Sequence, residues 1–408
     1  MQGHARLARG FVVSQLSARP AVRGELRVAI VHEWLVAPAG SEAVLQELVR
    51  LLPAADLFCV LDRLTAIDRA RLGVGHPRTT WLQRLPWAQH YYRALLPLMP
   101  HAIERLDLSA YDLVISNSHA VAKGVRPRPG AVHLCHCCSP IRYAWDLREQ
   151  YLREAGVSRG PAGWILRQLL ERLRRWDAAA TDRVNAFVAI SHFIADRIAR
   201  AYRRPSVVVY PPVDTDYFTI DDTVARGTHY LTASRLVGYK KIPAIVEAFR
   251  HLPDRQLVVI GDGPDRSRVL AAAGGNVTWL GHQSRERLRE EMRRAKAFLF
   301  AAEEDFGIVP VEAQACGTPV IALGRGGSLE TVSGDARHRT GHFFDTVSPE
   351  AIANAVREFE ALPAIEPMAC RTQAERFTVA KFHEGMRRAI LEAAPSAGSQ
   401  FTRTNVDC

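Results

Sequence analysis

Two glutamates, Glu304 and Glu312, have the spacing that points most directly to chemistry in this chain. Glu304 follows a buried strand expected at residues 297–302, and Glu312 lies about two turns into the helix predicted after it. In an open parallel sheet, ligands bind where strands end and the next helix presents free N–H groups to an anion. A carboxylate accepts hydrogen bonds from adjacent sugar hydroxyls, so the pair indicates a sugar site beside a phosphate site. An acidic helix start favoured by the helix dipole is the alternative.

Two cations, Arg235 and Lys240, lie between a strand expected at residues 230–233 and a helix expected at residues 242–249. Two positive charges beside a helix N-terminus can bind a diphosphate and offset the charge that it gains when a glycosyl bond breaks. They take the place of a metal ion in this step. Ordinary surface charge is the alternative interpretation of the pair.

Two glycines lie at turns where a strand leads into a helix. Gly40 separates the strand expected at residues 26–31 from the helix expected at residues 41–52, and glycine there lets the backbone approach a phosphate. Gly263 belongs to a turn that resembles a shortened dinucleotide fingerprint, because the third glycine of that motif is missing. An ordinary tight turn is the alternative for Gly40.

Histidines and cysteines are interleaved from His133 to Cys138, in the sequence HLCHCC. These residue types bind zinc, but neighbours on a strand point to opposite faces and no second cluster completes a tetrahedral site. We therefore predict no metal here. The sequence from Asp214 to Asp216 matches a metal-binding Asp-x-Asp motif, but it follows Pro212 in a linker, where turn chemistry explains it.

Strands and helices alternate along the chain, which predicts an α/β fold of two doubly wound parallel sheets facing across a cleft. Pro211 and Pro212 stiffen the connection between the halves and mark the boundary. The expected parts are a disordered basic extension (1–24), a first Rossmann-like domain (25–208), a second Rossmann-like domain (209–375), a helix that returns to the first domain (376–394) and a tail (395–408).

The sequence from Glu304 to Glu312, EDFGIVPVE, continues as AQACGTPVI. It resembles the Glu-(seven residues)-Glu signature of retaining glycosyltransferases of family 4, which have the GT-B fold of two Rossmann-like domains. The sequence SPIRYAWD at residues 139–146 resembles a region of bacterial mannosyltransferases that build O-antigen and exopolysaccharide. The resemblance extends over about residues 26–392.

The resemblance implies a donor site. Its residues are Gly40, Arg235, Lys240, Gly263, Glu304, Phe306, Gly307, Ile308 and Glu312. Within this set Arg235, Lys240 and Glu304 are the expected catalytic groups, because the cations bind the diphosphate and Glu304 takes the sugar hydroxyls. Glu312 takes the ribose hydroxyls, and the backbone of residues 306–308 lies along the sugar.

Two residues of the first half are expected on the sugar and acceptor side. Relatives commonly have His-Thr-Pro-Met-Arg where this chain has Cys138-Ser-Pro-Ile-Arg142. In the wider family that histidine contacts the donor sugar near the reacting carbon. Cys138 is a weak hydrogen-bond donor and would hold a hydroxyl less firmly than histidine does.

The reaction that the resemblance implies is transfer of a hexose from a nucleotide diphosphate sugar to a glycan hydroxyl, with retention at the anomeric carbon. GDP-mannose is the expected donor, a polyprenyl-diphosphate-linked glycan is the expected acceptor, and no further cofactor is expected. Three rivals remain open. They are a non-catalytic subunit, which Cys138 favours, a sugar-nucleotide epimerase or phosphorylase of the same fold, and a dinucleotide-dependent oxidoreductase, which the incomplete glycine fingerprint disfavours.

Charge is unevenly distributed along the chain. Residues 1–205 carry 29 basic and 17 acidic residues (net +12), residues 206–408 carry 24 and 26 (net −2), and the two sum to +10. A basic first half suggests an anionic partner, either a membrane surface or a phosphorylated substrate. No nucleic-acid-binding motif is recognised, and we expect no such partner.

An odd number of cysteines, 7, favours a reducing compartment, so we expect a cytoplasmic protein, peripheral at the inner face of the plasma membrane.

Two segments of the first half combine apolar and basic residues. Residues 81–106 interleave aromatic and basic side chains, which suits either a membrane interface or a buried helical hairpin. Residues 160–184 form an arginine-rich helical pattern, for which a surface helix with solvated arginines is the simplest interpretation. The apolar side of that helix is predicted to hold Trp164, Leu169, Leu173 and Trp176.

Overall fold

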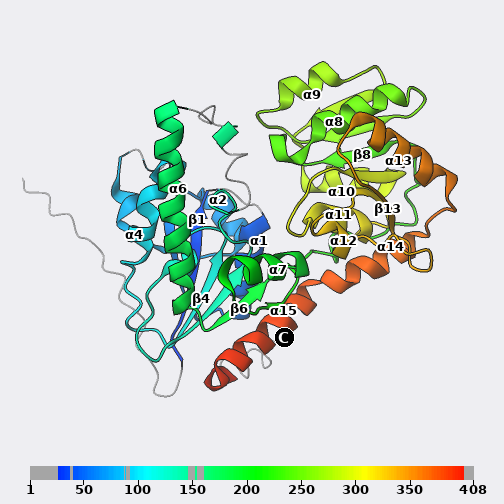
Figure 1. Ribbon diagram of the computed structural model, residues 1–408. Helices are drawn as coiled ribbons and strands as arrows, with labels where there is room; N and C mark the ends of the chain where they lie inside the picture. The colour runs from blue at the N-terminus through cyan, green and yellow to red at the C-terminus, as the bar shows by residue number, and fades with distance from the viewer. Residues whose placement is uncertain are drawn as a thin grey trace, which may run out of the picture.

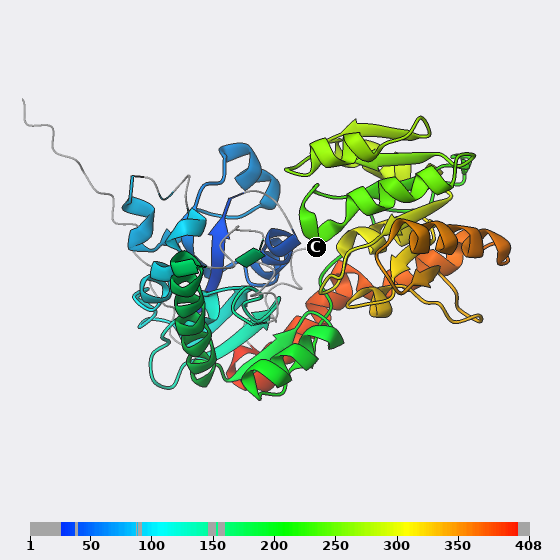
Figure 2. The ribbon, with the colours of Figure 1, turned by 45° about the horizontal axis from the view of Figure 1, so that its top comes forward.

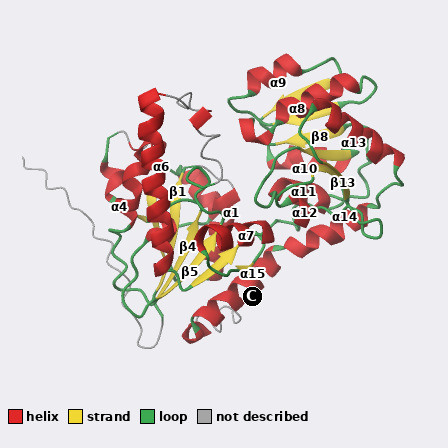
Figure 3. Cartoon of the chain, in the orientation of Figure 1, coloured by secondary structure: helices red, strands yellow, loops and turns green. Residues whose placement is uncertain are grey.

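The chain folds into two α/β lobes, each built around one parallel sheet (Figure 1). The computed structural model describes residues 26–36, 40–86, 88, 92–145, 152–153 and 160–398. The predicted extension (1–24), Asp146 at the end of the SPIRYAWD sequence and residues 399–408 lie outside this part of the chain. Figure 3 shows the strands of each lobe flanked by helices.

Within the described residues, the first sheet has seven parallel strands in the order β3-β2-β1-β4-β5-β6-β7. They are β1 (Val28–Leu35), β2 (Asp56–Asp62), β3 (Arg78–Thr79), β4 (Leu113–Ser118), β5 (Val132–Cys137), β6 (Ala186–Ala189) and β7 (Val207–Val208). The accompanying helices and 3-10 turns are α1 (Gly40–Leu51), α2 (Ala66–Leu72), η1 (Trp81–Arg84), η2 (Tyr92–Leu98), α4 (Met99–Ile103), η3 (Ala122–Gly124), α6 (Gly160–Ala180), η4 (Thr181–Arg183) and α7 (His192–Tyr202). The central strands are buried on both faces, as parallel strands between helices are.

The second sheet, whose residues are all described, has six parallel strands in the order β10-β9-β8-β11-β12-β13. They are β8 (Tyr230–Ala233), β9 (Leu257–Ile260), β10 (Val277–Gly281), β11 (Ala297–Phe300), β12 (Val320–Leu323) and β13 (Gly341–Phe344). The helices and turns are η5 (Gly238–Lys240), α8 (Ile242–Ala248), η6 (Phe249–His251), α9 (Arg266–Ala272), α10 (Arg285–Arg294), α11 (Ile308–Ala315), α12 (Ser328–Thr331), α13 (Pro349–Ala361), α14 (Pro367–Ala374) and η7 (Glu375–Phe377). The predicted doubly wound parallel α/β fold is therefore confirmed in both halves.

The last long helix, α15 (Val379–Ala393), leaves the second lobe and lies along the first one (Figure 2). Its buried residues Phe382, Met386 and Ile390 belong to the same core as Ile30 of β1. The 3-10 turn η8 (Pro395–Ala397) follows, and its Ala397 is also buried in that core. The predicted tail therefore begins later than residue 395, because these residues pack against the first lobe.

One prediction about the first lobe needs correction, and another stays open. The described part of residues 81–106 folds as η1, η2 and α4, with Leu82, Met99 and Ile103 buried in the core and Trp81 and Leu98 36% and 45% exposed. Contact of this exposed side with a membrane stays a prediction. The prediction that Trp164 lies on the buried side of its helix was wrong. Trp164 is 63% exposed, and the buried positions of α6 include Leu170 and Leu173.

Candidate active site

The loops after two neighbouring strands of the second sheet carry the predicted catalytic residues. The strand order reverses at β8 and β11, and ligands bind outside the carboxyl ends of such strands in sheets of this type. Arg235 and Lys240 follow β8, and Glu304 follows β11. Lys240 Nζ forms an ion pair with Glu304 Oε1, and the two side chains are 14% and 18% exposed. The fold thus brings Lys240 and Glu304, which are 64 residues apart, into direct contact.

Arg235 lies exposed in the loop that also carries Lys240. Its side chain makes no hydrogen bond or ion pair with any residue that the structure describes. The loop rests on the turn after β9, where Leu236 N donates to Asp262 O at 2.9 Å. Gly263 is required for this packing, because a Cβ at residue 263 would lie 2.4 Å from Leu236 O. Gly263 therefore shapes the Arg235 loop, and its contact with a donor stays a prediction.

The start of α11 is fixed by Gly307 and Phe306. Gly307 has a φ of +89°, in the left-handed region that favours glycine, and the helix begins at Ile308. Phe306 is 3% exposed, its ring lies 5.2 Å from that of Phe377, and its backbone packs against Gly327, where a Cβ would lie 2.6 Å from Phe306 N. Contact of the backbone of residues 306–308 with a sugar therefore stays a prediction. The first N–H groups of α11 have no partner within the helix, as at every helix start.

Gly40 places the first lobe against this helix start. A Cβ at residue 40 would lie 3.3 Å from Ile308 Cδ1, so the side chain of the first residue of α11 reaches the first residue of α1. The starts of two helices from different lobes are therefore near each other beside the Glu304 loop. The N–H groups and dipole of a helix start favour a negatively charged ligand.

Glu312 lies on α11 with a partly buried carboxyl group. Burial raises its pKa to about 7, the positive charge of Arg285 opposes this shift, and Asp214 adds to it. The Glu312 side chain makes no hydrogen bond or ion pair with a described residue. An unpaired carboxyl group of this kind is suited to accept or donate hydrogen bonds to ligand hydroxyls.

Cys138 and Arg142 lie after β5, and both have protein partners. Cys138 Sγ lies 3.3 Å from Asn117 Oδ1, to which it donates. Burial raises the pKa of the Cys138 thiol well above its usual range, so the group stays neutral. Arg142 forms an ion pair with Asp305 of the second lobe, and 30% of its side chain is exposed. Arg142 therefore bridges the lobes next to Glu304, and its approach to an acceptor stays a prediction.

Several contacts between the lobes were not predicted from the sequence. Asp305 also accepts a hydrogen bond from Arg197 at 3.0 Å, and Glu330 accepts from the backbone N–H groups of His192 and Phe193 at 2.8 and 2.9 Å. Asp305 lies inside the motif that drew attention to Glu304. Its partners, however, are 163 and 108 residues away in the sequence, and no local pattern identifies them.

The side chains from His133 to Cys138 are used within the first lobe. His133 Nε2 lies 2.8 Å from Ser116 Oγ, and His136 Nδ1 lies 3.0 Å from Asn117 Oδ1. Cys135 and Cys137 are buried in the core. Across the described residues, no three or more His, Cys, Asp or Glu side chains are grouped so that they could hold a metal ion.

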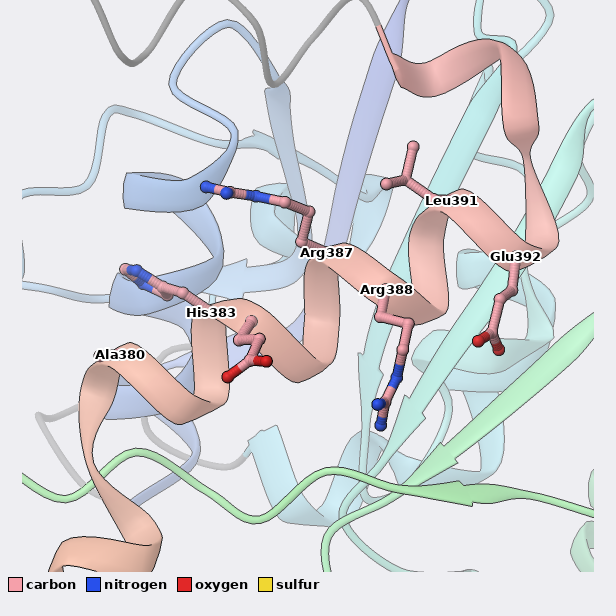
Figure 4. A pocket seen from close by; sticks show the side chains of 7 residues that line it. Ala380, His383, Arg387, Arg388, Leu391 and Glu392 are labelled. Atoms are coloured by element: carbon pink, nitrogen blue, oxygen red, sulfur yellow. The ribbon is translucent and has the colours of Figure 1, made fainter.

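A pocket of about 700 Å³ lies on α15, apart from the residues above (Figure 4). Its lining residues are Ala380, His383, Glu384, Arg387, Arg388, Leu391 and Glu392. His383 faces Glu47 of α1, with Nε2 3.0 Å from Oε2.

None of the helices in the described part of the chain is long and apolar enough to cross a membrane.

Two family models match the chain, one in each lobe. The model described as "Glycosyltransferase Family 4" matches residues 38–217, and the model described as "Glycosyl transferases group 1" matches residues 225–377. The two matches meet near the predicted boundary at Pro211 and Pro212, and together they span both lobes.

Curated relatives match over part of their length. A D-inositol 3-phosphate glycosyltransferase of Mycobacteroides abscessus is 35% identical over 171 residues, which are 37% of this chain and 38% of that protein. A GDP-mannose-dependent alpha-(1-6)-phosphatidylinositol monomannoside mannosyltransferase of Mycobacterium tuberculosis is 30% identical over 242 residues, 50% of this chain and 61% of that protein. The matched region thus spans less than two thirds of either relative.

Solved structures of similar fold cover nearly the whole molecule. Anabaena Alr3699/HepE in complex with UDP and glucose superposes with a TM-score of 0.65 at 16% identity, covering 90% of this chain and 99% of that one. The lipopolysaccharide outer core galactosyltransferase WaaB, in its apo form, gives 0.59 at 16% identity with the same coverage. At this identity the likeness extends to the arrangement of the two lobes and no further.

Proposed function

Since the chain belongs to glycosyltransferase family 4, we propose that it transfers a hexose from a nucleotide diphosphate sugar to a hydroxyl group of a glycan. The configuration of the anomeric carbon is retained. The observation that carries this proposal is the Lys240–Glu304 ion pair at the carboxyl ends of β8 and β11, near the place where the Ile308 side chain of α11 reaches Gly40 of α1.

The ion pair suggests how the site receives its donor. Without a ligand, Lys240 and Glu304 neutralise each other. A bound donor offers each of them a better partner: the diphosphate takes Lys240, and the sugar hydroxyls take the Glu304 carboxylate. Arg235, exposed on the same loop, supplies the second positive charge. This exchange of partners binds the diphosphate and the sugar in one event.

The same groups support bond cleavage. Negative charge grows on the diphosphate as the glycosyl bond breaks, and fixed cations stabilise it most strongly at that stage. Arg235 and Lys240 perform this role, and the leaving phosphate accepts the proton of the attacking hydroxyl. We name no side chain as a covalent nucleophile. Glu312 holds the ribose hydroxyls, as its unpaired carboxyl group allows.

For the donor we propose GDP-mannose. Two sequence similarities support it, those of residues 139–146 and of the Glu304 motif. The relative from Mycobacterium tuberculosis is named a GDP-mannose-dependent mannosyltransferase. The acceptor we propose is a glycan carried on a polyprenyl diphosphate, in the synthesis of cell-surface polysaccharide such as lipopolysaccharide or exopolysaccharide.

A lipid-linked acceptor places the enzyme at a membrane surface, and α6 offers a suitable contact. Trp164 and Ile165 are 63% and 53% exposed near its start, and Arg172 and Arg175 are exposed farther along. Aromatic and apolar side chains enter the headgroup region while arginines attract anionic lipids. We therefore propose peripheral binding of the first lobe at the cytoplasmic face of the plasma membrane.

A thermal-shift panel of GDP-, UDP- and ADP-sugars tests the proposal directly. A donor at 100 times its Kd stabilises the folded protein by about 2.7 kcal/mol, a shift that is readily measured. We expect GDP-mannose to give the largest shift and to be slowly hydrolysed by the purified protein. A shift with no hydrolysis of any donor would favour the non-catalytic subunit. No shift with any donor would overturn the proposed function.

A further inference from the structure

The carboxylate of Asp305 lies between two arginines of the other lobe. Arg142 donates to Oδ2, and Arg197 donates to Oδ1 at 3.0 Å. The backbone oxygen of Asp305 accepts a third bond, from Ser191 Oγ at 2.6 Å. The side chain is only 9% exposed, so these bonds are little screened by water. Among the described residues, the hydrogen-bond donors to the Asp305 carboxylate are thus both in the first lobe.

Rigid elements hold the partners of Asp305. The segment that carries Arg142 is anchored three residues later, where Trp145 Nε1 donates to Asp177 Oδ2 at 2.7 Å. Asp177 is fully buried in α6 and forms an ion pair with Lys123. Arg197 lies on α7, whose first turn is capped by Ser191. These contacts therefore fix the Glu304 loop relative to the first sheet.

We propose that Asp305 is a positioning residue for the transfer reaction: its two arginine contacts fix the Glu304 loop against the first lobe and so set where the Glu304 carboxylate meets the donor sugar. This inference rests on the proposed function. Arg235 and Lys240, the two cations proposed to bind the diphosphate, belong to the second lobe and keep their charges when this contact is lost. Loss of the contact should therefore affect the sugar step more than nucleotide binding.

The rival explanation is that Asp305 only joins the lobes. Glu330 provides the comparison, because it also joins them: it accepts from His192 N, Phe193 N and Tyr210 OH. It is not a neighbour of Glu304 in the sequence. If these carboxylates only join the lobes, the loss of either one, at Asp305 or at Glu330, should lower kcat by the same factor.

The test compares four variants of the full chain with the wild type. They are Asp305→Asn, Arg197→Gln, Glu330→Gln and, as a control for the loss of a carboxylate with two cationic partners, Glu360→Gln. Glu360 contacts Arg255 and Lys296 within the second lobe. For each protein we measure Tm, the Kd of GDP by calorimetry, and kcat for hydrolysis of GDP-mannose or of whichever panel donor the wild type hydrolyses.

We expect Asp305→Asn to lower kcat about 100-fold, the loss typical of a catalytic group misplaced by about 1 Å, while the Kd of the nucleotide stays within about threefold. Arg197→Gln, which keeps the Arg142 contact, should lower kcat about tenfold and serves if the first variant does not fold. Glu330→Gln and Glu360→Gln should lower kcat less than about threefold.

The outcomes separate two failures. A wild-type protein that hydrolyses no donor of the panel overturns the proposed function, and this inference with it. An active wild type overturns the positioning role alone if a folded Asp305→Asn or Arg197→Gln protein keeps its kcat within about threefold. An equal loss in Asp305→Asn and Glu330→Gln also overturns it, because simple joining of the lobes then suffices.

Discussion

Replacing Glu304 by glutamine should strengthen the binding of a free nucleoside diphosphate while it abolishes turnover. In the ligand-free protein the Glu304 carboxylate holds Lys240, so an incoming diphosphate has to displace it. Two unit charges about 4 Å apart attract each other by about 4 kcal/mol at an effective dielectric constant near 20. Glutamine keeps the shape and one hydrogen bond but removes that attraction.

The net gain is smaller than the Coulomb energy. The two side chains are 14% and 18% exposed, so water still screens the pair, and measured ion pairs of exposed side chains contribute about 0.2–1 kcal/mol. We take about 1.4 kcal/mol for this less exposed pair, which corresponds to a tenfold lower Kd for the nucleoside diphosphate. Turnover should fall at least about 10³-fold, because the sugar hydroxyls lose their charged acceptor.

Calorimetry with GDP and UDP measures the change, and the neighbouring acid supplies the control. Glu303 is exposed and makes no hydrogen bond or ion pair with a described residue. Glu303→Gln removes the same charge one residue away and should leave both Kd and turnover within about twofold. The reasoning is refuted if Glu304→Gln binds the nucleotide no more tightly than the wild type does, since Lys240 would then not be the group that both ligands share.

Three further changes test other parts of the account. Gly263→Ala places a Cβ 2.4 Å from Leu236 O, so it should lower Tm by several degrees and weaken nucleotide binding at least about tenfold in calorimetry. Burial raises the pKa of Glu312 to about 7, so the folded protein holds its carboxyl group mostly neutral at pH 5 and charged at pH 8, and the buried charge lowers stability as pH rises through 7. The Tm of Glu312→Gln minus that of the wild type should therefore be larger at pH 8 than at pH 5, by at least about 2 °C in a thermal scan. Trp164→Ala should reduce sedimentation with anionic vesicles severalfold, whereas Met368→Ala, which removes an apolar side chain 60% exposed in the second lobe, should not.

Local sequence signals were enough for the fold of the second lobe. Short apolar runs bounded by turn residues predicted strands that start at the first residues of β8 and β11 and end within two residues of their last ones, because buried parallel strands leave a continuous apolar pattern. Gly307, which belongs to the recognised Glu304–Glu312 motif, has a left-handed backbone directly before α11. Spacing also placed Lys240 and Glu304 after two predicted strands, but only the structure shows that these strands are neighbours and that the two side chains form an ion pair.

Contacts across the lobes could not be predicted from the sequence. The partners of Asp305 lie on α7 and after β5, and their identity depends on how two separately folded sheets dock. Trp164 shows the same limit at the surface. An apolar residue at helical spacing was assigned to the buried side, but α6 packs on the lobe through Leu170 and Leu173. Periodicity shows which residues share one face of a helix, but it does not show how much of that face the rest of the lobe covers.

The central claim is that Lys240 and Glu304 act together on the donor, and donor turnover by single variants tests it most directly. We would measure the release of nucleoside diphosphate from GDP-mannose, or from whichever panel donor the wild type turns over, by the wild type, Lys240→Ala and Glu304→Ala. Thermal scans would verify that each protein is folded. The account predicts that both variants lose at least about 10³-fold in kcat with the fold intact. A folded variant of either residue that keeps turnover within about tenfold of the wild type would contradict it.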